Sequence, residues 1–343
     1  MSNDQKVAPL KVGLAGFGVV GRKRYQFLES NDKFITVAIC EKRTSLHDPH
    51  RTNVCWFTDY QDLLDQDLDV VFVCMSNDMS AKVTIASLDR GCHTFCEKPP
   101  ARNITEMDQV VEAEKRTDNI KLKYGFNHRY HDSIRAALDI VNDNSMGRVI
   151  NIKGIYGKSN LITFDQTDWR TSRAIAGGGI LLDQGIHMVD LMRLFGGNFT
   201  KVHSFVSNDY WKYDVEDNVY ALMRSDEGVV AMLHSSATQW KHKFRLEVDL
   251  EDGLLGLSGI LSGSQSYGEE TLKITPGNSN AASTASESIT QFTEDNSWRD
   301  EISDFADDIL LDRSVSTGSS HDAQETMNLI EQIYAADRNW KSR

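Results

Sequence analysis

The chain lacks several features that would assign it to broad classes of protein. It contains no run rich in lysine and arginine, and its formal net charge of −13 is unfavourable for binding a nucleic-acid backbone. It also has no apolar stretch of about 18 residues, so no membrane-spanning helix is expected. Residues 1–10 lack the apolar core of a secretory signal. We therefore expect a cytoplasmic protein that binds neither nucleic acid nor a membrane.

Cysteine is also scarce. All five cysteines fall within the first hundred residues, mostly inside apolar runs, which is typical of buried reduced thiols in a cytosolic protein. Cys92, His93 and Cys96 lie close together in the sequence, but no second Cys or His pair follows at zinc spacing. The sequence therefore predicts no metal site.

The length of 343 residues predicts two domains, because one domain typically takes about 150 residues. In the first 127 residues, short apolar runs alternate with helix-compatible segments. This order favours a parallel, doubly wound α/β sheet. Period-two apolarity returns over residues 148–158, as expected for the first strand of a second sheet.

A glycine-rich turn joins the first predicted strand, residues 10–15, to a predicted helix at residues 22–30. The three glycines match the dinucleotide fingerprint, in which one forms the tight turn, one admits the pyrophosphate and one allows close helix packing. The helix N-terminus would face the phosphates. The predicted cofactor contacts in this turn are Gly16, Phe17, Gly18, Val19, Val20 and Gly21.

Glu41 ends the second predicted strand, about 20 residues beyond Gly21, where an acidic side chain accepts hydrogen bonds from the adenosine ribose. A carboxylate there favours NAD, because it would repel the 2′-phosphate of NADP. The basic neighbours Lys42 and Arg43 favour NADP. We expect NAD, with NADP possible; a solvated turn is the alternative reading of these three residues.

Two later strands end in polar residues at the edge of the sheet where ligands bind in open α/β folds. The strand predicted at residues 69–74 runs into Cys74, Met75, Ser76 and Asn77. The strand at residues 94–96 runs into Glu97 and Lys98, and two prolines then stop it. We expect all six to contact the cofactor, with Lys98 at the mouth of the crevice. The alternative is a solvated Glu-Lys pair that closes an edge strand.

Asp183 and His187 lie four residues apart in a glycine-led segment, residues 177–190. On a helix they would project from one face and could address a single substrate hydroxyl. An imidazole suits proton acceptance from an alcohol near neutral pH. The alternative for His187 is a core histidine on an amphipathic helix.

With the glycine turn, Glu97-Lys98-Pro99 and residues 177–190 together, the chain resembles the glucose-fructose oxidoreductase/inositol dehydrogenase/MocA (Gfo/Idh/MocA) family over nearly its whole length. The resemblance implies an NAD(P)-binding Rossmann domain at residues 1–127. It implies a second α/β domain at residues 128–343 with a large, open, mainly antiparallel sheet, whose closing helices could pack back on the first domain. It also implies a homodimer or homotetramer.

The resemblance further implies that Lys98, Asp183 and His187 are catalytic, with Lys98 beside the reacting hydroxyl. It places Asn127 near the cofactor and Arg129 near the substrate, although an interdomain salt bridge is an equal alternative for Arg129. Further expected substrate contacts are Tyr156, Trp169 and Arg170. Ser76 and Ser80 depart from the family pattern, in which many members have Pro and His.

These features predict an NAD(P)-dependent dehydrogenase that acts on a ring hydroxyl of a sugar, aminosugar or nucleotide-sugar. One alternative is a redox-neutral glycosidase or isomerase in which NAD is regenerated within the site. The other is a non-catalytic regulator that senses a sugar or dinucleotide. Retention of Lys98, Asp183 and His187 together disfavours the regulator.

Overall fold

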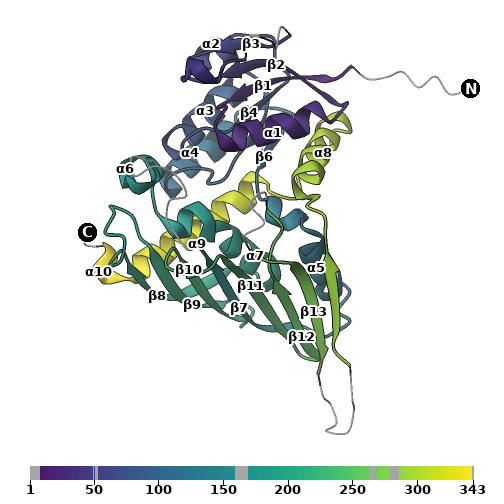
Figure 1. Cartoon of the computed structure of the whole chain (residues 1–343), viewed down its shortest axis with the longest axis vertical. Coiled ribbons are helices and arrows are strands. Elements are labelled where there is room, and N and C mark those ends of the chain that lie inside the picture. The colour runs from purple at the N-terminus through teal and green to yellow at the C-terminus, as the bar shows by residue number, and fades with distance from the viewer. Residues whose placement is uncertain are drawn as a thin grey trace, which may run out of the picture. The chain divides into compact units, whose positions relative to one another are not determined.

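The computed structural model describes residues 8–48, 50, 53–158, 169–262, 267–277 and 286–341. The chain divides into two units (Figure 1). The first comprises residues 1–125 and 298–324, and the second comprises residues 126–297 and 325–343. The predicted boundary between residues 127 and 128 lies two residues beyond this division.

A parallel sheet of six strands organises the first unit, in the order β3-β2-β1-β4-β5-β6. Its strands are β1 (Leu10–Ala15), β2 (Phe34–Cys40), β3 (Cys55–Phe57), β4 (Val70–Val73), β5 (His93–Cys96) and β6 (Leu122–Tyr124). The order reverses between β1 and β4, so the carboxyl ends of these two strands flank the point where such folds bind ligands. The predicted doubly wound sheet is confirmed; β3, at its edge, was not predicted.

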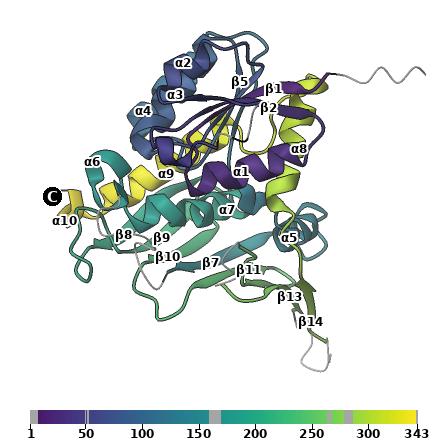
Figure 2. The same cartoon turned by 45° about the horizontal axis from the view of Figure 1, so that its top comes forward.

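Helices cover both faces of this sheet (Figure 2). One face carries α1 (Val19–Glu29) and α8 (Ser297–Leu310), and the other carries α3 (Asn77–Asp89) and α4 (Ile104–Glu114). A short helix, α2 (Tyr60–Leu64), follows β3. The core under α1 and α8 contains Leu28, Phe72 and Phe305 in one cluster. Because β4 is buried at all four residues, it reads as a continuous apolar run rather than an alternating one.

An eight-stranded sheet organises the second unit, in the order β14-β13-β12-β11-β7-β10-β9-β8. Only the β7–β10 pair is parallel among its strand pairs in the described residues. The strands are β7 (Val149–Gly157), β8 (Phe199–Ser207), β9 (Asn218–Ser225), β10 (Val230–Ser236), β11 (Lys243–Leu250), β12 (Gly253–Ser258), β13 (Glu270–Pro276) and β14 (Ser288–Phe292). The predicted mainly antiparallel sheet is confirmed, with two additional strands, β13 and the edge strand β14.

One face of this sheet carries helices, whereas no helix of the described residues covers the other (Figure 2). The helices of this unit are α5 (Asp132–Asn142), α6 (Arg173–Ala176), α7 (Ile186–Gly196), α9 (Ser320–Ala336), whose first residues belong to the first unit, and α10 (Arg338–Lys341). Strand β9 shows the resulting alternation, with Val219, Ala221 and Met223 buried under the helices.

The segment that carries Asp183 is not a simple α-helix. A single π-helical turn, η4 (Leu181–Gly185), precedes α7, so Asp183 and His187 lie on either side of a change in helical geometry. A Cβ atom at Gly185 would lie 2.5 Å from Ser235 Oγ, so only glycine lets this turn approach β10 so closely. Wide turns of this kind often occur at functional sites. In the described part of the chain, no helix is long and apolar enough to cross a membrane.

Candidate functional site

The glycine turn has the geometry that a dinucleotide requires. Gly16 has φ +97°, and a Cβ atom there would lie 2.3 Å from the carbonyl oxygen of Cys74. A Cβ atom at Gly21 would lie 2.0 Å from the Gly16 carbonyl oxygen. Gly18 caps α1 without a side-chain hydrogen bond, and the first turn of α1 holds no acidic residue. The first backbone donors of α1 are therefore suited to an anionic phosphate.

Glu41 lies at the end of β2, beside this turn. One of its carboxylate oxygens accepts from the backbone N–H of Phe17 at 3.1 Å, and the other accepts from Arg43 Nε at 2.9 Å. Burial disfavours the charged carboxylate, but the hydrogen bonds from Arg43 and Phe17 outweigh it and lower the pKa of Glu41. Arg43 is mostly exposed and Lys42 is exposed. Glu41 is thus an ionised acceptor at the expected ribose position, and Arg43 forms an ion pair with it.

The end of β4 forms a tight turn into α3. Ser76 precedes α3, and its hydroxyl donates to Asp78 Oδ1 at 2.6 Å. Ser80, one turn later, bonds the Ser76 carbonyl oxygen through both its N–H and its hydroxyl. The two serines that depart from the family pattern therefore close the turn on itself. Cys74, Met75 and Asn77 share this turn, and burial raises the pKa of the Cys74 thiol, which keeps it neutral.

Glu97 is held by a buried arginine in the first unit. Arg24 on α1 is fully buried between the rings of Phe95 and Trp298. Its Nε lies 2.5 Å from Glu97 Oε1, and its Nη2 lies 2.6 Å from Glu301 Oε2 on α8. This network anchors the residue immediately before Lys98. The carboxylate of Glu97 is bound to Arg24, and the cofactor contact expected of Glu97 stays a prediction.

Two carboxylates therefore share one buried cation. Burial raises the pKa of Glu301 to about 7, Arg24 opposes the rise, and Glu97 adds to it. Glu301 Oε1 and Arg24 Nη1 are buried without a hydrogen-bond partner. If Glu301 is protonated, the site contains one negative charge, on Glu97, and one positive charge, on Arg24. Lys98 itself is half-buried, and the Lys98–Pro99 peptide is cis.

In the second unit, Asp183 lies between two cations. Lys158, which directly follows β7, donates to Asp183 Oδ2 at 3.0 Å. Arg170 Nε lies 3.9 Å from the other carboxylate oxygen, and its guanidinium stacks over the Trp169 ring at 4.3 Å. The two cations favour the ionised form of Asp183. The predicted residues Trp169 and Arg170 thus share a cluster with Asp183, and Lys158 adds a member that was not predicted.

His187 lies at the start of α7 within a group of aromatic side chains. Its ring stacks on the ring of His128, with centroids 3.7 Å apart and planes 12° apart. His128 Nε2 lies 3.0 Å from the hydroxyl of Tyr156. Tyr156 also packs edge-on against Tyr267, whose hydroxyl bonds Gln184. Burial raises the pKa of Tyr156, so its hydroxyl stays protonated.

The side chains of Arg129 and Asn127 both bond to partners within the second unit. Arg129 makes a two-pronged ion pair with Asp190, through Nε at 2.8 Å and Nη2 at 2.6 Å. This pair is buried, and we assign it to the packing of η2 (Asn127–Tyr130) against α7. Asn127 donates to the hydroxyl of Ser297 at 3.1 Å. The roles predicted for these two residues at substrate and cofactor stay predictions.

A buried glutamate fixes the start of the segment that carries Asp183. Glu216 accepts from the backbone N–H groups of Gly179 at 2.7 Å and Leu181 at 3.0 Å, and from the Tyr334 hydroxyl at 2.7 Å. Burial raises its pKa, although these three donors oppose the rise. A single carboxylate thus ties η4 to α9. The sequence alone provided no signal for this role of Glu216, because its donors come from distant segments.

The described residues contain no group of three or more His, Cys, Asp or Glu side chains arranged to hold a metal ion. The site residues divide between the units: Lys98 and the glycine turn belong to the first unit, and Asp183 and His187 belong to the second.

Two family sequence models match the chain. "Oxidoreductase family, NAD-binding Rossmann fold" matches residues 10–126, and "GFO/IDH/MocA C-terminal domain" matches residues 134–255. The chain belongs to the Gfo/Idh/MocA oxidoreductase family. Its first unit is accordingly an NAD-binding Rossmann domain, as the glycine turn predicted.

Relatives with assigned activities match parts of this family member. Levoglucosan dehydrogenase of Pseudarthrobacter phenanthrenivorans is 30% identical over 44% of this chain and 39% of its own length. D-glucoside 3-dehydrogenase of Escherichia coli is 26% identical over 69% of this chain and 72% of its own length. Inositol 2-dehydrogenase of Salmonella typhimurium is 26% identical over 53% of each chain. The matches to the first and third thus span about half of those relatives or less.

Solved structures share the fold over almost the whole chain. Levoglucosan dehydrogenase in complex with NADH superposes with a TM-score of 0.83 at 21% identity, covering 97% of this chain and 98% of that one. Aldose-aldose oxidoreductase from Caulobacter crescentus superposes with a TM-score of 0.82 at 21% identity, covering 98% of each. The likeness extends to both sheets, which supports the two-sheet architecture described above.

Proposed function

We propose that the protein is an NAD(P)-dependent dehydrogenase that oxidises a ring hydroxyl of a sugar, aminosugar or nucleotide-sugar. One observation carries the proposal: one short segment of an oxidoreductase-family chain presents both an ionised carboxylate, Asp183, and an imidazole, His187. An alcohol oxidation needs one group to orient the hydroxyl and another to take its proton. The Rossmann domain of the same chain supplies the cofactor site.

The cofactor would be held by the glycine turn and the end of β2. The backbone donors at the start of α1 would bind the pyrophosphate, and Glu41 would accept from the ribose. The chemistry that a bound nicotinamide supplies is acceptance of a hydride from the hydroxyl-bearing carbon. We propose NAD as the working cofactor, because the lowered pKa of Glu41 keeps a negative charge where NADP carries its 2′-phosphate.

His187 takes the hydroxyl proton in the proposed reaction. Asp183, fixed by Lys158, orients the hydroxyl or the imidazole. Lys98 stabilises the negative charge that develops on the hydroxyl oxygen as its proton leaves. Trp169, with Arg170 stacked on it, offers an apolar face of the kind that sugar rings pack against. We assign Tyr156 a supporting role, because its hydroxyl is bonded to His128.

The direct test is incubation of the purified protein with NAD⁺ and a panel of sugars, aminosugars and nucleotide-sugars, with NADH absorbance as the readout. The proposal expects net NADH formation with at least one of them. Conversion of a sugar without net NADH would instead show redox-neutral turnover. Tight NAD binding without conversion of any sugar would favour a sensor.

We further propose that a second copy of this chain covers the open face of the eight-stranded sheet. Phe205 is 78% exposed there, Leu222 is 54% exposed, and Met232 is 44% exposed. A patch of this kind marks an interaction surface. The resemblance to the family implies that another subunit buries this face.

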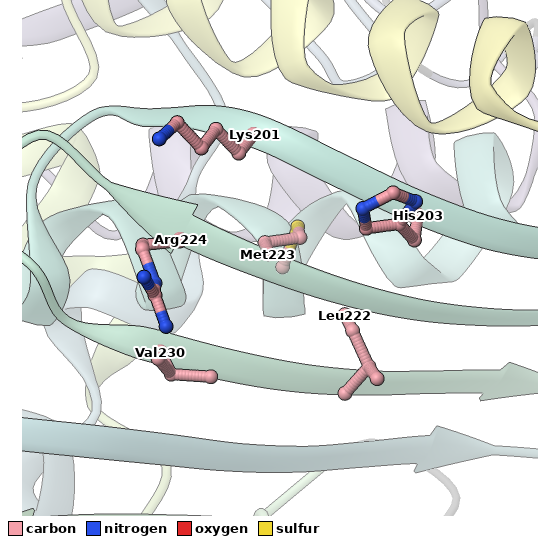
Figure 3. Close-up of a pocket in the computed structure, with 6 residues that line it drawn as sticks. All are labelled: Lys201, His203, Leu222, Met223, Arg224 and Val230. Carbon is pink, nitrogen blue, oxygen red and sulfur yellow. The ribbon is translucent and has the colours of Figure 1, made fainter.

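A shallow pocket of about 290 Å³ lies on the same face, at β8, β9 and β10 (Figure 3). Lys201 and Arg224 line it from directly opposite positions on β8 and β9. Two like charges in this register repel each other, so an acidic group from the second copy would relieve them. Light scattering of wild-type protein and of Leu222→Asp tests the proposal. We expect an oligomer for wild type and dissociation for the variant, with Leu311→Asp, an exposed leucine in the first unit, as the control.

We place the protein in the cytoplasm, because all five cysteines are free thiols, which is the usual state in a reducing compartment.

A further inference from the structure

We propose that His128 is a positioning residue that holds the ring of His187 and remains neutral beside it. The proposal rests on the proposed function, in which His187 accepts the substrate proton. The sequence suggested roles for its neighbours Asn127 and Arg129 but none for His128 itself. It lies in η2, a short 3₁₀ segment in the connection between β6 and α5, and both its imidazole and that of His187 are buried.

The stack between the two rings is close and nearly parallel. The centroids are 3.7 Å apart and the planes differ by 12°. At this separation His128 covers one face of the His187 ring, so the ring cannot tilt toward that side. Two positive charges this close in a buried site would repel strongly. The arrangement therefore works for proton acceptance only if one ring is uncharged when the other takes the proton.

The hydrogen bonds around His128 select its neutral form. Ser297 donates its hydroxyl proton to Asp295 Oδ1 at 2.6 Å, so its oxygen accepts from the Asn127 amide nitrogen at 3.1 Å. This fixes the orientation of the Asn127 amide, and its oxygen points to His128 Nδ1 at 3.3 Å. An amide oxygen only accepts, so Nδ1 of His128 carries the proton of this bond.

The other nitrogen of His128 then has a lone pair to offer. The Tyr156 hydroxyl lies 3.0 Å from Nε2, a distance at which a phenol O–H donates to the lone pair of a neutral imidazole. A second positive charge against the stacked His187 ring would be unfavourable, so we take the hydroxyl as the donor. With Nδ1–H donating and Nε2 accepting, His128 is a neutral imidazole in a single tautomer. The two hydrogen bonds also fix the orientation of the His128 ring. Because the His187 ring stacks on it nearly in parallel, the orientation of the His187 ring is restricted as well.

The charged groups around this pair are largely paired among themselves. His131 packs edge-on against His128, and its Nδ1 lies 2.8 Å from Glu270 Oε2. From α7 and η2, Asp190 is neutralised by Arg129. The remaining titratable groups near the stack are Asp183, Lys158, Tyr156, Tyr267 and His242. His128 is thus the group in direct face-to-face contact with His187.

The first arm of the test is structural and needs no substrate. Nitrogen-15 NMR of histidine-labelled full-length protein reports which ring nitrogen carries a proton, with His128→Phe and His187→Phe used to assign the two signals. We expect a neutral Nδ1–H tautomer for His128 near neutral pH. A charged His128, or the Nε2–H tautomer, would overturn the inference whether or not the protein oxidises sugars.

The second arm is kinetic, on any sugar that the wild-type protein oxidises. His128→Ala should lower kcat by about 10-fold or more and leave the NAD⁺ affinity and the sugar KM nearly unchanged, because it removes the face that holds His187. His128→Phe keeps a flat, neutral face and should recover most of kcat. His321→Ala, at an exposed histidine on α9, is the control and should match wild type. Wild-type kcat in His128→Ala would contradict the proposal.

Asn127→Asp keeps the shape of the side chain but places a carboxylate against His128 Nδ1, and it gives up the bond that the amide nitrogen donates to Ser297. A carboxylate against Nδ1 favours a charged His128, and a cation stacked on His187 makes His187 a weaker base. The acidic limb of the kcat/KM profile should then move to lower pH, with a lower plateau. If the kcat/KM pH profile of Asn127→Asp does not shift and His128→Phe fails to recover kcat, His128 has a purely structural role and the proposal is wrong. A wild-type protein with the expected tautomer but no sugar oxidation would refute the proposed function and leave the stack intact.

Discussion

Replacement of Arg24 by methionine should destabilise the protein far more than an ordinary surface change. The guanidinium contacts Glu97 at 2.5 Å and Glu301 at 2.6 Å, and both side chains are largely or fully removed from solvent. Methionine fills most of the volume between the Phe95 and Trp298 rings but supplies no charge. Removal of one partner from a buried ion pair costs about 3–5 kcal/mol, because the remaining charge is left without compensation.

The loss should depend on pH in a direction that the structure sets. The pKa of Glu301 is raised to about 7 in the folded protein, above its unfolded value. Protonation of Glu301 therefore stabilises wild type fully below its unfolded pKa, and this contribution is lost as pH rises through about 7. Arg24 favours the ionised form of Glu301, so the stability lost on removal of Arg24 should depend on pH. At about pH 8 both Glu301 and Glu97 would be left without a compensating cation, whereas at about pH 5 only Glu97 would be left so. The loss of stability should therefore be larger at about pH 8.

Urea unfolding followed by tryptophan fluorescence measures this effect, and Trp298 lies directly against Arg24. The matched control is Arg22→Met, on the same helix two residues earlier and exposed to solvent. We expect Arg24→Met to lose about 3 kcal/mol or more near pH 8 and Arg22→Met to lose less than about 0.5 kcal/mol. Equal losses for the two variants, or a larger Arg24→Met loss at acid pH, would refute this account of the buried network.

Other predictions follow from the sites. Lys98→Ala and His187→Ala should each lower kcat by about 10² or more, while calorimetric NAD⁺ titration gives nearly unchanged affinity; near-normal turnover by Lys98→Ala would remove it from the mechanism. Wild type should bind NAD more tightly than NADP in the same titration. If NADP binds more tightly instead, Arg43→Ala should weaken NADP selectively. Glu216→Gln should destabilise the protein by about 1–3 kcal/mol in thermal unfolding, because its amide cannot accept all three bonds; an unchanged midpoint would argue against its anchoring role.

Local signals were enough to predict the parallel sheet and the glycine turn. Gly21 is a glycine because of a close contact with the Gly16 carbonyl oxygen five residues earlier, and Gly16 also has a positive φ, so the spacing of glycines in this turn appears directly in the sequence. Proline after Lys98 marked the strand end for the same reason. The predicted i, i+4 pairing of Asp183 and His187 assumed a regular helix, whereas the chain makes a π-helical turn there. A hydrophobic period of 3.6 does not distinguish the two geometries.

Long-range partnerships were beyond the sequence alone. Arg24 and Glu301 are 277 residues apart, and nothing local to either marks it as half of an ion pair. The same holds for His128, whose stacking partner and bonding partners lie on α7, on β7 and next to it in sequence. The edge strand β14 and its neighbour β13 also escaped prediction, since short, polar, partly exposed strands carry a weak alternation signal. The sequence thus proposed the candidate reactive groups, whereas the structure supplied the residues that contact them.

The most direct test of the proposed function is NADH formation by wild type, Lys98→Ala and His187→Ala on the same sugar, with NAD⁺ affinity measured for each. The account predicts that wild type reduces NAD⁺ with a sugar that carries a free ring hydroxyl, and that both variants bind NAD⁺ normally but form NADH about 10²-fold more slowly or worse. Wild-type rates in both variants would contradict the claim that Lys98 and His187 carry the chemistry.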